Sequence, residues 1–402
     1  MEEKIKRQIS LISESLVYAE KTSLDLSLFC GKAGYSLFKI NEKLISNSRE
    51  EVLFLIQNYF DETFLSLQNN KQMQGGYNLC LGYSGIIWYY SYLVNLGFAE
   101  LGTLDSMENQ LLNSSLNDLR NGEYDYLHYS LGLALAISNR NVFDKVKLDY
   151  FDSLIEILDD NKKDYDSGIA WVLNSDPKNP NAYEFKTINL SLSHGIPSII
   201  CLLSKLIKIK DINPKAKYLL ENSVNFLLSL RLKKDNNVSL YPVNCYEDGT
   251  IMEGFSRLGW CYGDLGIAIA LWNAGKALDR SDLKNEALEI LIHSTKRLDL
   301  KQNAIKDACL CHGTSGMAHI YNRFYKETKL KEFDDARLYW LNETLKMSKY
   351  DDGIAGYKTW EESGWKNNDS LLEGVTGIGL ALLGFLSENP EDLNWDTCLL
   401  LS

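Results

Sequence analysis

The chain of 402 residues lacks the features that mark several classes of protein. It contains only 6 proline residues, which leaves little room for long proline-rich linkers. Its longest apolar runs, such as Gly374 to Leu386, are too short to span a bilayer. The first seven residues have no apolar core and therefore do not form a signal peptide. These absences predict a cytoplasmic location.

Positive charge is also scarce. The chain has 42 Lys and Arg against 54 Asp and Glu, and its formal net charge is −12 at pH 7. This balance argues against a nucleic-acid partner, because the phosphate backbone requires a basic face. An acidic surface is compatible with a basic peptide partner. In a reducing compartment, we expect the 8 cysteines to be unpaired or metal-bound.

The chain does contain a motif that recurs seven times. Each copy is a Gly-x-x-Gly sequence, or a near variant, followed by an apolar run. The copies begin at Gly31, Gly82, Tyr129, Gly195, Gly263, Gly313 and Gly374. Two copies are degenerate, with Tyr129 and Ser198 at positions where glycine is usual. The spacing leaves room for two helices in each repeat.

The repeat predicts an all-α fold. Amphipathic runs lie between the copies, for example at residues 219–228 and 287–293, and each repeat then forms a helical hairpin. An open solenoid would need polar end repeats, whereas the first and last copies here are as apolar as the others. We therefore expect an α/α toroid (a double α-barrel) of seven hairpins with Gly-x-x-Gly turns, as one domain over residues 1–402. Irregular insertions near residues 159–189 and 233–259 are expected to form loops with short strands.

Three residues beside the glycine turns suggest a metal site. Cys261 and Cys311 each stand two residues before a turn glycine, and His312 stands one residue before. In adjacent hairpins, equivalent positions are expected to lie side by side. The three residues would then converge as a Cys₂His set, and three ligands with one open position are typical of catalytic zinc. Burial of the same residues in the core is the alternative. Cys309 is an additional cysteine nearby.

These residues also match a known family. Arg257 with Trp260-Cys261-Tyr262-Gly263, Cys311-His312-Gly313 and Ser193-His194-Gly195 together resemble the lanthionine synthetase C-like family, the lanthipeptide cyclases. The resemblance covers nearly the whole chain, from about Gly31 onward. It implies one Zn²⁺ per chain and the addition of peptide cysteine thiols to dehydroalanine or dehydrobutyrine, which closes (methyl)lanthionine thioether rings.

The resemblance also implies roles for individual residues. His194 matches the family's catalytic histidine and is a candidate acid for the enolate formed by thiol addition. Asp125 matches an aspartate before the third turn, where it could take the thiol proton or orient His194. Arg257 could stabilise the enolate oxygen, and Trp260 and Tyr262 could line the substrate pocket. The alternatives are a structural His194, a salt-bridged Arg257 and an Asp125 that caps its turn.

The resemblance further implies partners. They are a dehydrated lanthipeptide precursor peptide, together with a dehydratase and an ABC exporter in a membrane-associated complex. The chain would then reach the membrane only through these partners.

Two rival functions remain open at this point. Other α/α barrels are glycosidases that use paired carboxylates, for which Asp125, Asp264 and Glu373 are candidates. The other rival is a non-catalytic zinc-containing relative that binds a peptide or glutathione. We interpret His128, His293 and His319 as structural or exposed residues.

Overall fold

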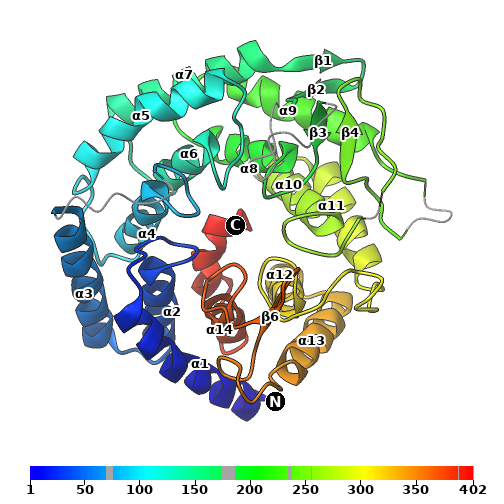
Figure 1. Cartoon of the computed structure of the whole chain (residues 1–402). Helices are drawn as coiled ribbons and strands as arrows, with labels where there is room; N and C mark the ends of the chain where they lie inside the picture. Colours follow the sequence, from blue (N-terminus) through cyan, green and yellow to red (C-terminus); the bar gives the residue numbers. More distant parts are fainter. Residues whose placement is uncertain (69–75, 174–185, 234–237, 255, 388, 402) are drawn as a thin grey trace. The chain divides into compact units, whose positions relative to one another are not determined.

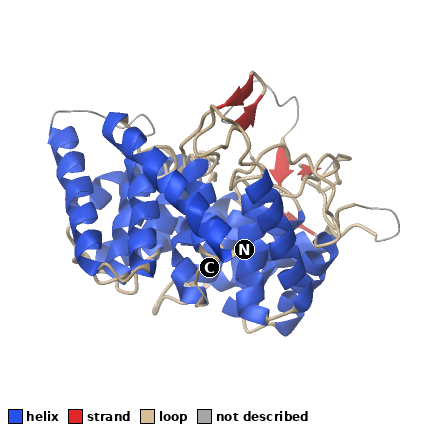
Figure 2. Cartoon of the chain, turned by 90° about the horizontal axis from the view of Figure 1, so that it is seen from below, coloured by secondary structure: helices blue, strands red, loops and turns tan. Residues whose placement is uncertain are grey.

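The structure, a computed structural model, describes residues 1–68, 76–173, 186–233, 238–254, 256–387 and 389–401. Helices account for most of the described residues (Figures 1 and 2), and the strands among them are short. The predicted all-α class is therefore confirmed. In the described part of the chain, no helix is both long and apolar enough to cross a membrane.

A helix begins at each of the seven predicted turns. We call these the motif helices: α2 (Lys32–Ile45), α4 (Tyr83–Asn95), α6 (Ser130–Ser138), α8 (Ile196–Leu206), α10 (Asp264–Ala277), α12 (Thr314–Thr328) and α14 (Val375–Leu383). The flanking helices are α1 (Glu2–Thr22), α3 (Arg49–Gln68), α5 (Asp105–Arg120), α7 (Lys145–Asn161), α9 (Lys215–Ser229), α11 (Ser281–Ser294) and α13 (Lys331–Lys346). The amphipathic runs at 219–228 and 287–293 lie in α9 and α11, as predicted. A 3₁₀ helix, η1, covers Pro390–Leu399.

The helices pack in two compact units. The first comprises Met1–Gly76, Cys80–Tyr89 and Asp299–Asp396. Within it, α14 packs against α12 and α2, and the flanking helices α13, α1 and α3 cover these three motif helices (Figure 1). The first unit therefore has a layer of motif helices backed by a layer of flanking helices.

The second unit comprises Tyr77–Leu79, Tyr90–Leu298 and Thr397–Ser402. Here α8 packs between α6 and α10, and the flanking helices α5, α7 and α9 pack in succession (Figure 1). Helices α9 and α11 also pack against α8 and α10, respectively. The same two-layer arrangement thus recurs in this unit. The structure does not test the prediction of a single domain.

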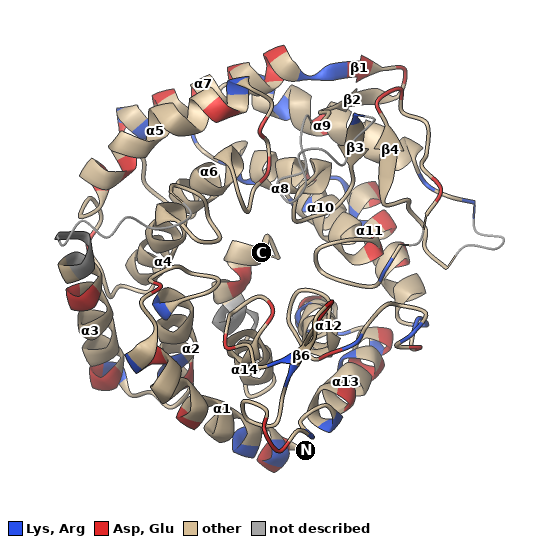
Figure 3. Cartoon of the chain, viewed as in Figure 1, with Lys and Arg blue, Asp and Glu red and all other residues tan. Residues whose placement is uncertain are grey.

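Sequence patterns explain the two layers. All nine residues of α14 are buried, and nearly all of α8 is buried, as expected for helices that are apolar on every side. Charged residues instead lie on flanking helices such as α5, α7 and α13 (Figure 3). The motif helices therefore form the core, and the flanking helices have one polar face.

Close backbone contacts explain the turn glycines. A Cβ at Gly316 would lie 2.0 Å from the carbonyl oxygen of Leu310, so a larger residue would displace the backbone. Gly263 additionally has a φ of +97°, which favours glycine. At the equivalent position of the third turn, Tyr129 has a φ of −135°, which any residue can adopt.

Backbone hydrogen bonds hold neighbouring turns in register. The Cys311 N–H donates to the Leu372 carbonyl (2.9 Å), and the Phe29 N–H donates to the Cys80 carbonyl (3.3 Å). The Ser193 N–H donates to the Cys261 carbonyl (3.4 Å). Each of these six residues stands two positions before the first residue of its motif. Equivalent positions of neighbouring turns are therefore adjacent, as the repeat predicted.

The predicted insertions contain short antiparallel strands. Strand β1 (Lys163–Tyr165) pairs with β2 (Gly168–Ala170), and β3 (Thr187–Asn189) pairs with β4 (Asn244–Tyr246). Residues 174–185, 234–237 and 255 of these insertions lie outside the described part of the chain. A third pair, β5 (Thr359–Glu361) and β6 (Gly364–Lys366), was not predicted from the sequence.

Candidate functional site

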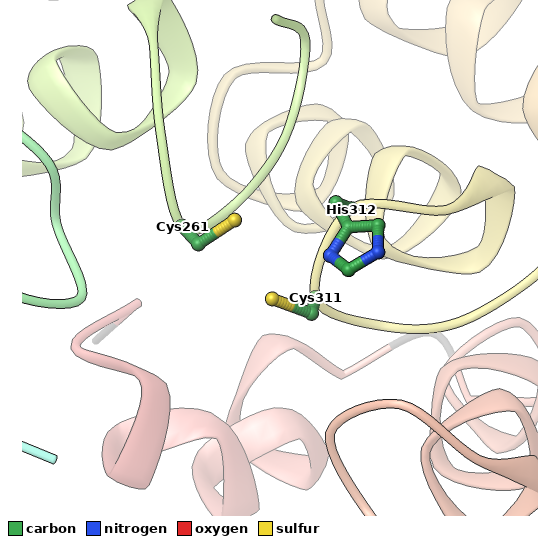
Figure 4. A group of neighbouring side chains, drawn as sticks. All are labelled: Cys261, Cys311 and His312. Atoms are coloured by element: carbon green, nitrogen blue, oxygen red, sulfur yellow. The ribbon is translucent and has the colours of Figure 1, made fainter. Parts of the chain in front are cut away.

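The two cysteines and the histidine singled out from the repeat form a group. The thiols of Cys261 and Cys311 and a ring nitrogen of His312 all lie within 4.8 Å of one another (Figure 4). Both cysteines are only 6 % exposed, and His312 is half-buried. The group is therefore a candidate metal centre.

Firm backbone contacts position both cysteines. The Cys261 carbonyl accepts hydrogen bonds from the Leu192 and Ser193 N–H groups, at 3.0 and 3.4 Å, and the Cys311 N–H is bonded to Leu372. Beside Cys261, the Trp260 indole donates from Nε1 to the Leu399 carbonyl (2.8 Å). These contacts fix the two turn segments, which favours a pre-organised metal site.

The donor set fits zinc. Tetrahedral zinc with thiolate and imidazole ligands places the donor atoms roughly 3.5–3.8 Å apart, given its usual bond lengths. The mutual separation of at most 4.8 Å needs only a small contraction to reach that geometry. Thiolates select soft or borderline metals over magnesium or calcium. Three protein donors also leave one tetrahedral position for a further ligand.

Cys309 belongs to a second possible group, together with Asp307 and His312. The Asp307 carboxylate already accepts hydrogen bonds from the Cys309 N–H (3.0 Å) and the Trp360 N–H (2.9 Å). Burial raises the pKa of the Cys309 thiol to about 11. These contacts favour Cys311 over Cys309 as a metal ligand.

A carboxylate and an imidazole meet beside the fourth turn. Asp125 Oδ2 lies 2.5 Å from His194 Nδ1, while Asp125 Oδ1 accepts the N–H groups of Leu127 (2.7 Å) and His128 (2.9 Å). The carboxylate is 3 % exposed and His194 is half-buried. Asp125 thus combines the turn-capping interaction with a bond that fixes the orientation of His194.

Two rings border His194. The His128 ring is nearly parallel to that of His194, with centroids 5.7 Å apart and planes 13° apart. The Tyr262 ring lies 6.1 Å away at 45°. Tyr262 therefore lies beside His194, as a pocket residue would. No sequence motif marks His128, yet its ring nitrogen lies within 4.8 Å of ligand atoms of both Asp125 and His194.

Trp260 and Arg257 are the two remaining candidate site residues. Trp260 is 1 % exposed and its ring meets Tyr126 edge to face, which favours packing over direct substrate contact. Arg257 is half-buried, and its carbonyl oxygen lies where a side chain at Gly263 would project. The roles assigned to Arg257 and Trp260 therefore stay predictions.

One of the three carboxylates considered for a glycosidase, Asp264, is occupied by structural contacts. Asp264 is fully buried, and it accepts the Leu240 and Tyr241 N–H groups at 3.1–3.2 Å and pairs with Arg297. Burial raises its pKa to about 6. Asp264 therefore stabilises the loop that contains Leu240 and Tyr241, and its side chain is buried away from solvent.

His319 confirms the structural interpretation given to it. It is fully buried, and its Nε2 lies 2.8 Å from Asp396 Oδ2, which also pairs with Arg323. This ion network holds α12 to η1 within the first unit. His319 therefore contributes to packing of the unit.

Comparisons with known proteins agree with the fold and with the family that the sequence resembles. The sequence is 24 % identical over 283 residues to the nisin biosynthesis protein NisC of Lactococcus lactis subsp. lactis, covering 67 % of this chain. The match spans only 63 % of the length of that relative. The structure is similar to a nisin cyclase with a TM-score of 0.78, at 22 % identity, over 99 % of this chain and 97 % of that chain.

This structural likeness confirms the predicted α/α toroid fold. A sequence model of the family described as lanthionine synthetase C-like protein matches residues 22–400. Because that match covers nearly the whole chain, the protein belongs to the lanthionine synthetase C-like family.

Proposed function

We propose that the chain is a zinc-dependent lanthipeptide cyclase. It would add cysteine thiols of a dehydrated precursor peptide to dehydroalanine or dehydrobutyrine and so close (methyl)lanthionine rings. The Cys261, Cys311 and His312 group carries the proposal, because two thiols and an imidazole suit one zinc ion and leave a position for a substrate thiol. Membership of the family and likeness to a nisin cyclase support it.

The proposal assigns the metal site to Cys261, Cys311 and His312. A bound zinc ion would supply a Lewis acid that keeps a thiol deprotonated near neutral pH. The two cysteines would contribute negative charge to this site and keep the bound sulfur electron-rich. Their burial excludes water, which strengthens these electrostatic interactions.

His194 and Asp125 would carry out the proton transfer in ring closure. The Asp125 carboxylate would accept a hydrogen bond from Nδ1–H of His194, which would leave Nε2 for acid–base chemistry. Thiol addition to the β-carbon of a dehydro residue gives an enolate that must gain a proton on its α-carbon. His194, protonated at Nε2 and stabilised by the Asp125 carboxylate, would supply that proton.

Other residues would bind and orient the peptide. Tyr262, beside His194, would line the pocket, and the Arg257 guanidinium would stabilise the enolate oxygen. Trp260 would hold the turn that carries Cys261 and Tyr262. The same proposal includes a cytoplasmic location, with a dehydratase and an ABC exporter as partners through which the chain reaches the membrane.

Incubation with a dehydrated peptide that contains one cysteine and one dehydroalanine tests the proposal. Free thiol would be counted by alkylation and mass spectrometry. We expect rapid thiol loss with the wild-type chain, and loss of both metal and activity in Cys261→Ala and His312→Ala. Cys201→Ala is the matched control, because Cys201 is buried outside the metal group and accepts a hydrogen bond from Asn273.

The two rivals give different results. A non-catalytic relative would bind the peptide and zinc without increasing the rate of thiol loss. A glycosidase would need a carboxylate pair available to a sugar, but Asp264 is already bonded to two backbone N–H groups and to Arg297. These contacts argue against Asp264 as a glycosidase carboxylate, and the glycosidase would leave the Cys261, Cys311 and His312 group without a function.

A further inference from the structure

Two cysteines outside the candidate metal group lie together in the first unit. Cys30 lies in the turn before α2, and Cys80 lies in the turn before α4. The backbone bond from Phe29 N–H to the Cys80 carbonyl (3.3 Å) fixes these two turns side by side. The thiols of Cys30 and Cys80 are hydrogen-bonded to each other. Their contact is therefore a consequence of the register of the turns.

The pair differs from the other cysteines in accessibility. Cys30 is exposed and Cys80 is half-buried, whereas Cys201 and Cys245 are buried. Cys30 is therefore the more solvent-accessible residue of the pair, and Cys80 is its hydrogen-bonding partner. An accessible thiol next to a second thiol is the usual arrangement of a redox-active pair.

Electrostatics favour Cys30 as the attacking thiol. Its hydrogen bond with Cys80 lowers the pKa of Cys30, although burial and the carboxylates of Asp25 and Glu373 act in the opposite direction. Burial instead raises the pKa values of Cys201 and Cys245 to about 12. Thiolate is the nucleophile in disulfide exchange, so Cys30 should react before these two residues.

A metal ion is a weaker explanation of the pair. Among the described residues, no third cysteine, histidine or carboxylate has a ligand atom within 4.8 Å of both thiols. Structural zinc normally requires four protein ligands and catalytic zinc three. Two adjacent thiols without a third ligand fit disulfide chemistry better.

We propose that Cys30 and Cys80 form a dithiol site that exchanges with small-molecule disulfides and closes into an intramolecular disulfide. With glutathione disulfide, the Cys30 thiolate attacks one sulfur, which forms a mixed disulfide and releases one glutathione thiolate. The Cys80 sulfur then attacks the Cys30 sulfur, loses its proton and releases the second glutathione. The two protein thiols are oxidised, and one glutathione disulfide is reduced to two glutathione thiols.

The test treats the full metal-loaded chain with glutathione disulfide and maps the modified cysteines by peptide mass spectrometry. In the wild type, we expect a disulfide that links the Cys30 and Cys80 peptides, formed at least tenfold faster than any change at Cys201. In Cys80→Ser, the reaction should stop at a mixed disulfide on Cys30. In Cys30→Ser, Cys80 should react no faster than Cys201.

Two results would overturn the proposal. The first is that the wild-type chain keeps glutathione on Cys30 while Cys80 remains a thiol. The two sulfurs would then be too far apart to form a disulfide. The second is equal reactivity of Cys30 and Cys201. Circular dichroism of each variant identifies a loss of folding. Because the mapping reports each cysteine separately, the result does not depend on whether the proposed cyclase activity is correct.

Discussion

Replacement of Asp125 by asparagine separates the two functions of its carboxylate. Oδ1 accepts the N–H groups of Leu127 and His128, and an amide oxygen can accept the same two bonds. Oδ2 contacts His194 Nδ1 at 2.5 Å, and an amide nitrogen there would donate where a carboxylate accepts. Asp125→Asn should therefore keep the turn and reverse the preferred tautomer of His194.

The size of the effect follows from the chemistry of His194. Positioned acid–base catalysis contributes about 10²–10⁴-fold to a rate. Loss of the carboxylate that fixes a catalytic histidine can remove that entire contribution. We therefore expect kcat for ring closure to fall by about 10²–10⁴-fold in Asp125→Asn, which is about 2.7–5.4 kcal/mol.

Single-turnover thiol consumption, followed from pH 5.5 to 8.5, measures this effect. The control variant is Asp25→Asn, because Asp25 caps a turn through Ser27 N–H in the same way and belongs to none of the candidate groups. The control should keep near wild-type activity. Zinc content and the urea unfolding midpoint should be unchanged in both variants.

One result would refute this reasoning. If Asp125→Asn retained its fold and closed rings within threefold of the wild-type rate, with the same pH profile, Asp125 would only cap its turn. The proton would then have to come from another group, and His194 would lose its orienting partner in the proposed mechanism.

Three further predictions concern metal selection and stability. Cys309→Ala should keep its zinc and its ring-closing activity, measured on purified protein; loss of zinc would show that Cys309 is a ligand. Glu108→Ala should lower unfolding stability by up to about 3–5 kcal/mol in urea titrations, because it removes the fully buried carboxylate that Arg140 and Lys147 share and leaves them the more exposed Asp105 in common; a change below 1 kcal/mol would contradict this. The Asp264 pKa is raised from 3.8 to about 6, so the folded state holds this proton more tightly than the unfolded state. Its contribution of about 3 kcal/mol is present below pH 4 and is lost as pH rises through 6, so Asp264→Asn should flatten stability between pH 4 and 7; an unchanged slope would refute the assignment.

The repeat was predictable from sequence because its causes are local. Gly316 is required by the approach of the Leu310 carbonyl, six residues earlier in the same turn. The apolar runs then identify the motif helices, since helices buried on every side lack polar positions. Tyr129 departs from the glycine pattern, yet a helix still begins at this turn, and the φ of Tyr129 is accessible to any residue.

The candidate site was predictable only in part. Cys261 and Cys311 share one position in the repeat, and hydrogen bonds such as Phe29 N–H to Cys80 O show why equivalent positions of neighbouring turns are adjacent. The neighbour of His194 was harder to predict, since the stacking of His128 depends on side-chain rotamers that a sequence pattern does not record. Contacts of the insertion near residues 233–259, such as the hydrogen bonds from the Leu240 and Tyr241 N–H groups to Asp264, depend on long-range packing and could not be predicted either.

The metal content of the purified chain tests the central claim most directly. Elemental mass spectrometry should find about one zinc ion per chain in the wild type and in Cys201→Ala, and much less in Cys311→Ala, because the proposed site needs both thiols and the imidazole of His312. Wild-type protein that contains no zinc, and gains none when zinc is supplied, would contradict the account. The Cys261, Cys311 and His312 group would then be only a cluster of packed side chains.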